Sequence, residues 1–350
     1  MNHRSGSRDR AWLSAPLAAA VVMVSAVSAV APSASAEPNA MSKVSAGLAY
    51  VTTNLGYQNA AAAGTGVVLT PVGEVLTNNH VIRGATTIKV QDVNNGHTYT
   101  ATVVGYDVAD DIAVLRLRGA TGLRTAPVGN STSVKVGAKV TAIGNAGGAG
   151  GTPRSVGCRV TALNTSITAS DESGGWSEQL NGLIETDCAL VAGMSGGPLA
   201  SSAGKVVGLN TAASSGFEFM SGENKGFAIP MGAAMAIVRQ IDAGHFSGNV
   251  HRGATAFLGL HVMDSGYVQN GNFHAGVLVV GVVPGSPAQK KGLGYGDVVT
   301  QLNGKSLASA TALTNALLAM SPGAKVTLKW VDQIGDPHSA TVTLGSGPPQ

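Results

Sequence analysis

The segment Gly193-Met194-Ser195-Gly196-Gly197 places a serine hydroxyl among glycines. Glycine gives little steric cover and readily takes positive φ, so we expect the hydroxyl to be exposed while nearby N–H groups point at a substrate oxygen. Glycine and serine are also ordinary turn residues. The segment alone therefore indicates a surface turn as readily as a nucleophile.

A histidine and an acid stand upstream, in positions that suit a base and its partner. His80 ends one apolar run, and Asp110-Asp111 opens another. A serine hydroxyl needs a base such as histidine, and a buried carboxylate must fix the tautomer of that histidine. Spacing does not separate Asp110 from Asp111, and Asp107 is a third, weaker choice. The order along the chain is base, acid, nucleophile.

The surrounding segments predict short strands. Six or so apolar segments over residues 50–117 predict one small antiparallel barrel, and residues 130–136 form a connection. Residues 139–230 predict a second barrel, which a helix over 231–243 caps. Gly-x-Ser-x-Gly also occurs in α/β-hydrolases, which run Ser, acid, His. An esterase of that class needs a catalytic histidine after residue 195. The order found here is instead that of the chymotrypsin-like fold.

With these motifs the chain resembles the HtrA family of PDZ-bearing serine proteases, and in particular its secreted or surface-tethered actinobacterial members, over roughly residues 45–345. The resemblance implies a mostly β protein, with a chymotrypsin-like double β-barrel followed by a PDZ domain. It favours Asp111 as the acid, because in the family the acid directly precedes the Ile-Ala-Val-Leu run. It implies a His80–Asp111–Ser195 triad, with the N–H groups of Gly193 and Ser195 as the oxyanion hole. The family usually has Asn or Asp where Met194 stands.

The second domain rests on its own ordered motifs. Phe257-Leu258-Gly259-Leu260 resembles the carboxylate-binding loop of PDZ domains, and the segments 281–288 and 296–299 match further landmarks. An apolar-striped helix over 309–320, with Ser309 as its N-cap, is expected beside the groove. The resemblance implies that peptide C-termini add to the sheet as a strand and contact Leu258, Gly259 and Leu260.

Changes in composition along the chain indicate its domain boundaries. Residues 1–36 combine a basic start, an apolar run and an Ala-x-Ala site, which predicts a cleaved signal peptide and a secreted or cell-envelope protein. A retained membrane anchor is the alternative. We expect a protease domain over 37–244, a polar linker with solvated histidines over 245–255, a PDZ domain over 256–345 and a disordered tail over 346–350.

The two cysteines, Cys158 and Cys188, favour a disulfide in an exported chain. In the fold that the chain resembles, their strands are neighbours; two free thiols are the alternative. The formal charge is only +3 and forms no basic patch, so nucleic acid is not an expected partner. We expect no metal and no cofactor. The Gly-rich segment 146–151 predicts a turn rather than a phosphate site, and residues 166–177 predict a mobile loop.

In the chymotrypsin-like fold that the chain resembles, the pocket for the residue before the cut is walled by the segments that here are 189–192 and 209–213, and these contain no charged residue. Its predicted substrate-binding residues are Leu190, Leu209, Asn210 and Thr211. They favour cleavage after small or medium apolar residues, which unfolded or misfolded proteins expose. The resemblance also implies a homotrimer. Tyr50 and Tyr57 are candidates for its contacts, with ordinary packing residues as the alternative. The alternative function is a PDZ-bearing chaperone scaffold with an idle protease domain.

Overall fold

The computed structural model describes residues 37–170, 177–211, 225–246, 249–269 and 271–350. The predicted leader over residues 1–36 lies outside these ranges. Within the ranges described, no helix combines the length and the apolar composition that are needed to cross a membrane.

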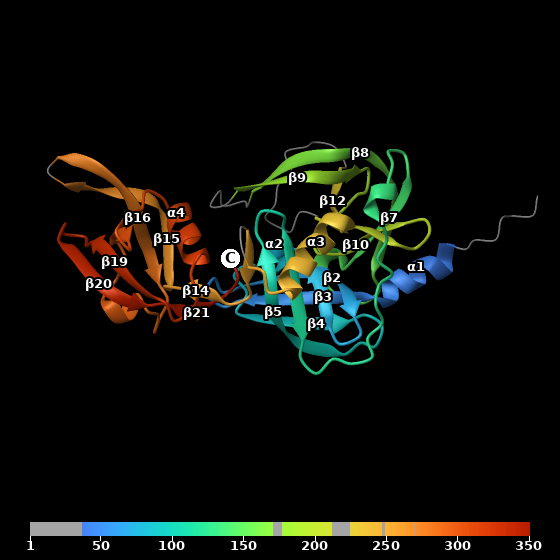
Figure 1. The fold of residues 1–350 in the computed structure, drawn as a ribbon, viewed down its shortest axis with the longest axis horizontal. Coiled ribbons are helices and arrows are strands. Elements are labelled where there is room, and N and C mark those ends of the chain that lie inside the picture. The colour runs from blue at the N-terminus through green and yellow to red at the C-terminus, as the bar shows by residue number, and fades with distance from the viewer. Residues whose placement is uncertain (1–36, 171–176, 212–224, 247–248, 270) are drawn as a thin grey trace, which may run out of the picture. The chain divides into compact units, whose positions relative to one another are not determined.

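Six antiparallel strands close into the first barrel, in the order β5-β4-β1-β2-β3-β6. Figure 1 shows four of them, β2 to β5, by their labels. Alternation of side chains explains why such segments form strands. Ile88 and Val90 are buried, whereas Thr87 and Lys89 are exposed. The strands are β1 (Leu48–Leu55), β2 (Ala60–Thr70), β3 (Glu74–Thr77), β4 (Thr87–Asp92), β5 (Thr98–Asp107) and β6 (Ile112–Leu117). The prediction of one small barrel is confirmed.

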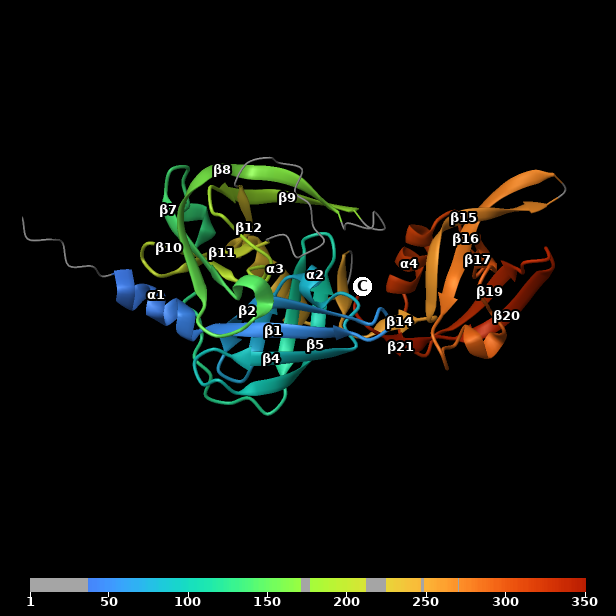
Figure 2. The same ribbon diagram turned by 180° about the vertical axis from the view of Figure 1, so that it is seen from behind.

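The second barrel is also closed, in the order β10-β11-β12-β9-β8-β7. The long strands β8 and β9 lie side by side in both views (Figures 1 and 2). The strands are β7 (Lys139–Gly144), β8 (Arg154–Ser170), β9 (Ser177–Thr186), β10 (Pro198–Ser201), β11 (Val206–Asn210) and β12 (Gly226–Pro230). The loop predicted over 166–177 is therefore wrong for residues 166–170 and 177, and residues 171–176 lie outside the described residues. Polar residues extend the ribbon there because threonine is β-branched and Ile167 pairs with Leu180.

Cys158 in β8 and Cys188 just after β9 form a disulfide, with their Cα atoms 5.1 Å apart. The predicted pairing is confirmed. The bond joins residues separated by 30 positions. In the chain-entropy model, closing such a loop stabilises the fold by about 3–4 kcal/mol.

Helix α3 (Met231–Asp242) confirms the helix predicted over 231–243. Its apolar stripe of Ala234, Ile237, Val238 and Ile241 is buried in the core of the two barrels. The sequence analysis did not predict two further helices, because one is short and the other has only a weak apolar stripe. They are α1 (Glu37–Ala46) and α2 (Asn79–Ile82), alongside the single turns η1 (Ser131–Ser133) and η2 (Ala146–Gly148).

The predicted linker contains a strand of the first barrel. β13 (Val250–Arg252) pairs with β5, and Val250 is buried in the core. The sequence concealed this strand because its other two residues are His251 and Arg252. His251 is half-buried, its ring centroid lies 5.4 Å from that of Tyr106, and burial lowers its pKa. The prediction of a solvated histidine is therefore wrong for His251, whereas His245 is exposed as predicted.

The PDZ region has a separate core, which includes Leu258, Val279, Leu302 and Leu328. Its main sheet runs β15-β16-β17-β19-β20, with β18 paired to β17. The elements are β14 (Thr255–Phe257), β15 (Leu260–Gln269), β16 (Asn272–Val282), η3 (Gln289–Lys291), β17 (Val298–Leu302), β18 (Lys305–Ser306), α4 (Ala310–Leu318), β19 (Lys325–Val331), β20 (Pro337–Thr343) and β21 (Gly345–Gly347). Ser309 caps α4 as predicted, accepting from the Ala312 N–H at 3.1 Å.

The last residues of the chain differ from the predicted disordered tail. β21 pairs with β14. Beyond it, the Pro349 carbonyl accepts from the Gly84 N–H at 2.7 Å, and the Gln350 main-chain oxygen accepts from Asn79 Nδ2 at 3.0 Å. Two prolines restrict this segment before it folds, so ordering it costs less entropy than ordering a flexible tail.

Candidate active site

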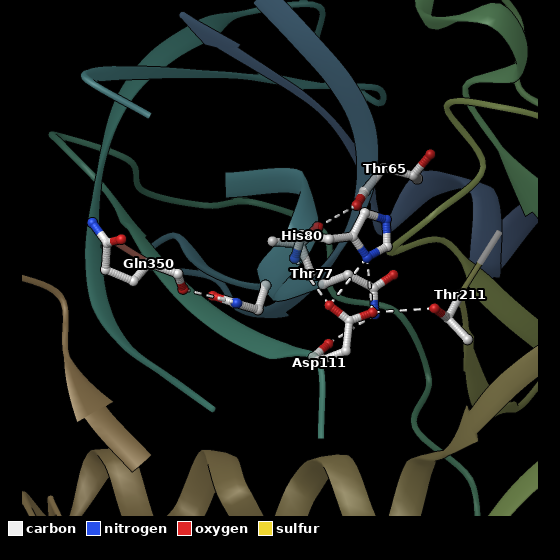
Figure 3. Close-up of polar contacts among 8 residues, drawn as sticks. Thr65, Thr77, His80, Asp111, Thr211 and Gln350 are labelled. Atoms are coloured by element: carbon white, nitrogen blue, oxygen red, sulfur yellow. Dashed lines mark hydrogen bonds and ion pairs between the residues drawn. The ribbon is translucent and has the colours of Figure 1, made fainter. Parts of the chain in front are cut away.

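His80, on α2, is held by Asp111 through its ring and its backbone (Figure 3). Nδ1 lies 2.8 Å from Oδ2 and 3.0 Å from Oδ1 of Asp111, and the His80 N–H donates to Oδ1 at 2.9 Å. The two side chains are only 5% and 3% exposed. A carboxylate on Nδ1 leaves Nε2 as the nitrogen that can take a proton from a hydroxyl.

Among the three candidate acids, Asp111 is the one that contacts His80. Asp110 is exposed. Asp107 is buried and accepts from the Asp110 N–H, and burial raises its pKa to about 6. Asp111 has φ of 52°, a left-handed conformation that a short polar side chain tolerates. This turn between β5 and β6 directs its carboxylate toward α2.

Two further side chains fix Asp111. Thr211 Oγ1 donates to its Oδ2 at 3.1 Å, and Asn78 Nδ2 donates to its main-chain oxygen at 2.9 Å. Both residues are buried. The sequence analysis placed Thr211 in the substrate pocket and did not single out Asn78, whose signal was only its position two residues before the histidine.

The loop around Ser195 is bonded to both barrels. The Ser195 carbonyl accepts from the Thr65 N–H of β2 at 2.8 Å, and the Gly196 N–H donates to the Asn210 carbonyl at 2.8 Å. Gly193 and Gly196 have φ of 87° and 78°, as the sequence predicts.

The Ser195 side chain is not exposed, contrary to the sequence prediction; the residue is 1% exposed. A Cβ on Gly196 would lie 2.1 Å from the Thr65 carbonyl oxygen, and one on Gly197 would lie 2.2 Å from that of Ile143. The glycines therefore let backbone of both barrels pack directly against the loop that carries the buried serine.

Met194 has no exposed surface and belongs to an apolar cluster with Val140, Ile184 and Leu199. Its carbonyl accepts from the Gly197 N–H at 3.0 Å. The position where the family usually has a polar residue is thus anchored here by packing in the second barrel.

The predicted pocket residues take different places. Leu190 is partly buried against the cluster around Met194. Leu209 is in the barrel core, and Asn210 Nδ2 donates to the Pro198 carbonyl at 3.1 Å. Leu209, Asn210 and Thr211 are all buried, so the structure gives their side chains partners within the protein. The rest of that second wall, residues 212 and 213, lies outside the described residues.

Tyr50 and Tyr57 both have partners within the chain. Tyr50 is buried and its hydroxyl donates to the Gly151 carbonyl at 2.7 Å. The Tyr57 ring stacks on that of Phe257, with centroids 5.2 Å apart. Tyr50 is thus an internal packing residue, whereas Tyr57 remains 40% exposed.

The predicted peptide-binding loop leads into β15, an edge strand of its sheet. Leu258 is buried, Gly259 has φ of 81°, and Leu260 is partly buried. The Gly259 carbonyl accepts from the Val283 N–H at 2.9 Å, which ties the loop to the end of β16. A Cβ on Gly259 would lie 2.2 Å from that of Ser286, so the position requires glycine.

Comparison with known proteins agrees with this two-part architecture. Residues 64–209 match the trypsin-like peptidase domain model, and residues 256–344 match the PDZ domain model. The serine protease PepD of Mycobacterium tuberculosis is 33% identical over 334 residues, which cover 90% of this chain and 68% of that protein. A probable periplasmic serine endoprotease DegP-like of Chlamydia trachomatis is 38% identical over 283 residues, covering 78% of this chain and 52% of the relative.

The chain thus spans about half the length of the chlamydial relatives that it matches. Among solved structures, an HtrA-type protease, AlgW with tripeptide, is 28% identical with a TM-score of 0.50, covering 90% of this chain and 98% of that one. The paired domain matches and the extent of the likeness to PepD lead to one conclusion: the chain belongs to the HtrA family of PDZ-bearing serine proteases.

Proposed function

We propose that the protein is a serine endopeptidase in which Ser195 attacks the peptide carbonyl, His80 accepts the serine proton and Asp111 orients the histidine. The observation that carries the proposal is the contact of both Asp111 carboxylate oxygens with His80 Nδ1, at 2.8 and 3.0 Å, in a buried site. As the imidazole gains the proton, the adjacent carboxylate stabilises its positive charge. His80 then returns the proton to the leaving amine.

The N–H groups of Gly193 and Ser195 are the proposed oxyanion hole. Positive φ at Gly193 supports this, because it lets the N–H groups of residues 193 and 195 point to the same side while the Met194 N–H between them donates to the Val191 carbonyl. Charge that develops on the substrate oxygen is then stabilised by dipoles that are already in place. Losing one such donor typically costs 10²–10³ in turnover.

Specificity for small or medium apolar residues is supported by the wall Ala189-Leu190-Val191-Ala192, which has no charged side chain. A charged substrate side chain would be desolvated there without a partner, at a cost of several kcal/mol. Because apolar side chains are mostly buried in folded proteins, the proposed substrates are unfolded or misfolded chains.

The PDZ domain is proposed to bind peptide C-termini along the free edge of β15, through Leu258, Gly259 and Leu260. Export, by secretion or to the cell envelope, is supported by the disulfide and by relatives whose names describe them as periplasmic. The proposal of a homotrimer rests on the family resemblance alone.

Mapping the cut sites in a denatured model protein tests both activity and specificity. We expect wild-type protein to cut mainly after Ala, Val, Leu or Ile, and Ser195→Ala to leave the substrate intact. A dominant preference for Lys, Arg or Glu before the cut would refute the specificity. Equal suppression of aggregation by both proteins, with cleavage by neither, would favour the chaperone scaffold.

A further inference from the structure

The main chain on either side of the proposed oxyanion donor is held by two hydrogen bonds. The Ala192 carbonyl accepts from the Gly147 N–H at 2.8 Å. The Gly193 carbonyl accepts from Thr65 Oγ1 at 2.7 Å. Because C=O and N–H point in opposite directions across a trans peptide, holding the Ala192 carbonyl fixes the direction of the Gly193 N–H.

Thr65 belongs to β2 of the first barrel, whereas the loop that it holds belongs to the second. Its hydroxyl also accepts from the Asn145 N–H at 2.9 Å, and the residue has no exposed surface. One hydroxyl thus joins the Gly193 carbonyl to Asn145, at the start of the Gly-rich segment. Thr65 also holds the backbone of Ser195, because the Ser195 carbonyl accepts from the Thr65 N–H at 2.8 Å.

The Gly-rich segment is part of the same support. Asn145 Oδ1 accepts from the Gly150 N–H at 2.8 Å, and the Asn145 carbonyl accepts from the Gly148 N–H at 2.9 Å. A Cβ on Gly193 would lie 2.1 Å from that carbonyl oxygen. The turn therefore packs directly on the Gly193 backbone and presents the Gly147 N–H to Ala192.

We propose that Thr65 is a positioning residue for the oxyanion hole. Its hydroxyl, by bonding both the Gly193 carbonyl and the Asn145 N–H, holds the Gly-rich turn against the loop, and the Gly147 N–H of that turn then fixes the Ala192 carbonyl and with it the direction of the Gly193 N–H. A hydroxyl can donate and accept at once, which valine of the same shape cannot do. The inference rests on the proposed roles of Ser195 and Gly193. It predicts that Thr65 affects the transition state rather than substrate binding.

The test compares Thr65→Val with Thr65→Ser in the full chain. We expect Thr65→Val to lower kcat on denatured casein by about 10–100-fold with KM within about threefold, because it impairs an oxyanion donor. The rate of Ser195 labelling by a fluorophosphonate should fall in parallel. Thr65→Ser should restore both to within about threefold of wild type, since it keeps the hydroxyl.

Thr186→Val is the matched control. Thr186 is also buried, and its hydroxyl likewise donates to a carbonyl, that of Gly226 at 3.1 Å, and accepts from an N–H, that of Cys188 at 3.4 Å. We expect it to lower Tm about as much as Thr65→Val does while kcat stays near wild type. If Thr65→Val does not fold, Thr65→Ala is compared with Thr65→Ser at low temperature.

A folded Thr65→Val protein with kcat within about threefold of wild type would overturn the proposal, as would Thr65→Ser being equally impaired or Thr186→Val losing kcat to the same extent. If the wild-type protein fails to label at Ser195, the proposed catalytic role of Ser195 is wrong, and this result is distinct from a failure of the proposal for Thr65.

Discussion

At the scale of single residues, one carboxylate is selected from three that are close in sequence. Asp111 reaches His80 because its backbone is left-handed, whereas its neighbour Asp110 is exposed on the same turn. Spacing in the sequence left this choice open, because it does not report the direction of a side chain within a turn. Only the family resemblance favoured Asp111.

We predict that Asp111→Asn lowers kcat by about 10³–10⁴, because an amide that donates to Nδ1 stabilises the wrong tautomer of His80. Asp110→Asn is the control, with the same chemical change one residue away on an exposed side chain. Its kcat should stay within about threefold of wild type. Steady-state kinetics on a peptide substrate decide the matter, and equal losses in the two variants would contradict the assignment.

Residue types predicted only part of the conformation of the loop around Ser195, the proposed nucleophile. Positive φ at Gly193 and Gly196 follows from glycine itself. The burial of Ser195 does not, because it is a property of the tertiary structure, in which Thr65 of β2 and Ile143 of β7 pack against the neighbouring glycines, and no local pattern reports it. The role of Thr65 was hidden for the same reason: its hydroxyl acts on a loop 128 positions away.

At the scale of elements, strand alternation and helix periodicity predicted most of both barrels and α3. The exceptions are elements whose stability comes from a partner. β13 is polar except for Val250 and exists through its pairing with β5, and the ends of β8 and β9 support each other as a ribbon. The four-residue helix α2 is too short for a period to register.

Asp107, the last residue of β5, makes the free energy of unfolding depend on pH. Burial raises the pKa of Asp107 to about 6. The folded state therefore binds this proton more tightly than the unfolded chain does. The stabilisation that protonated Asp107 provides is fully present below its pKa in the unfolded chain, near 4. It is lost as the pH rises through its pKa in the folded protein, about 6.

We predict that Asp107→Asn, which keeps the oxygen that accepts from the Asp110 N–H, raises the stability at pH 8 by up to about 3 kcal/mol. The difference from wild type should shrink toward zero at pH 4. Thermal unfolding of both proteins at the two pH values measures this. A gain that is the same at both pH values would mean that ionisation of Asp107 is not its cause.

At the scale of the whole molecule, the order of motifs predicted a two-barrel protease followed by a PDZ domain, and the matched domains agree. Contacts between segments far apart in the chain could not be predicted from the sequence. Residues 349 and 350 bond to Gly84, just after the His80 helix, and to Asn79, at its start, although their composition suggested a disordered tail. No local pattern encodes a partner more than 250 positions away.

The central claim is that Ser195 is a nucleophile activated by His80 in the intact chain. The most direct measurement is reaction of the full-length protein with a fluorophosphonate, followed by mass spectrometry of the digested product. We predict a single adduct on Ser195 that forms in wild type and disappears in both Ser195→Ala and His80→Ala. A wild-type protein that stays unlabelled, or one that labels equally well without His80, would contradict it.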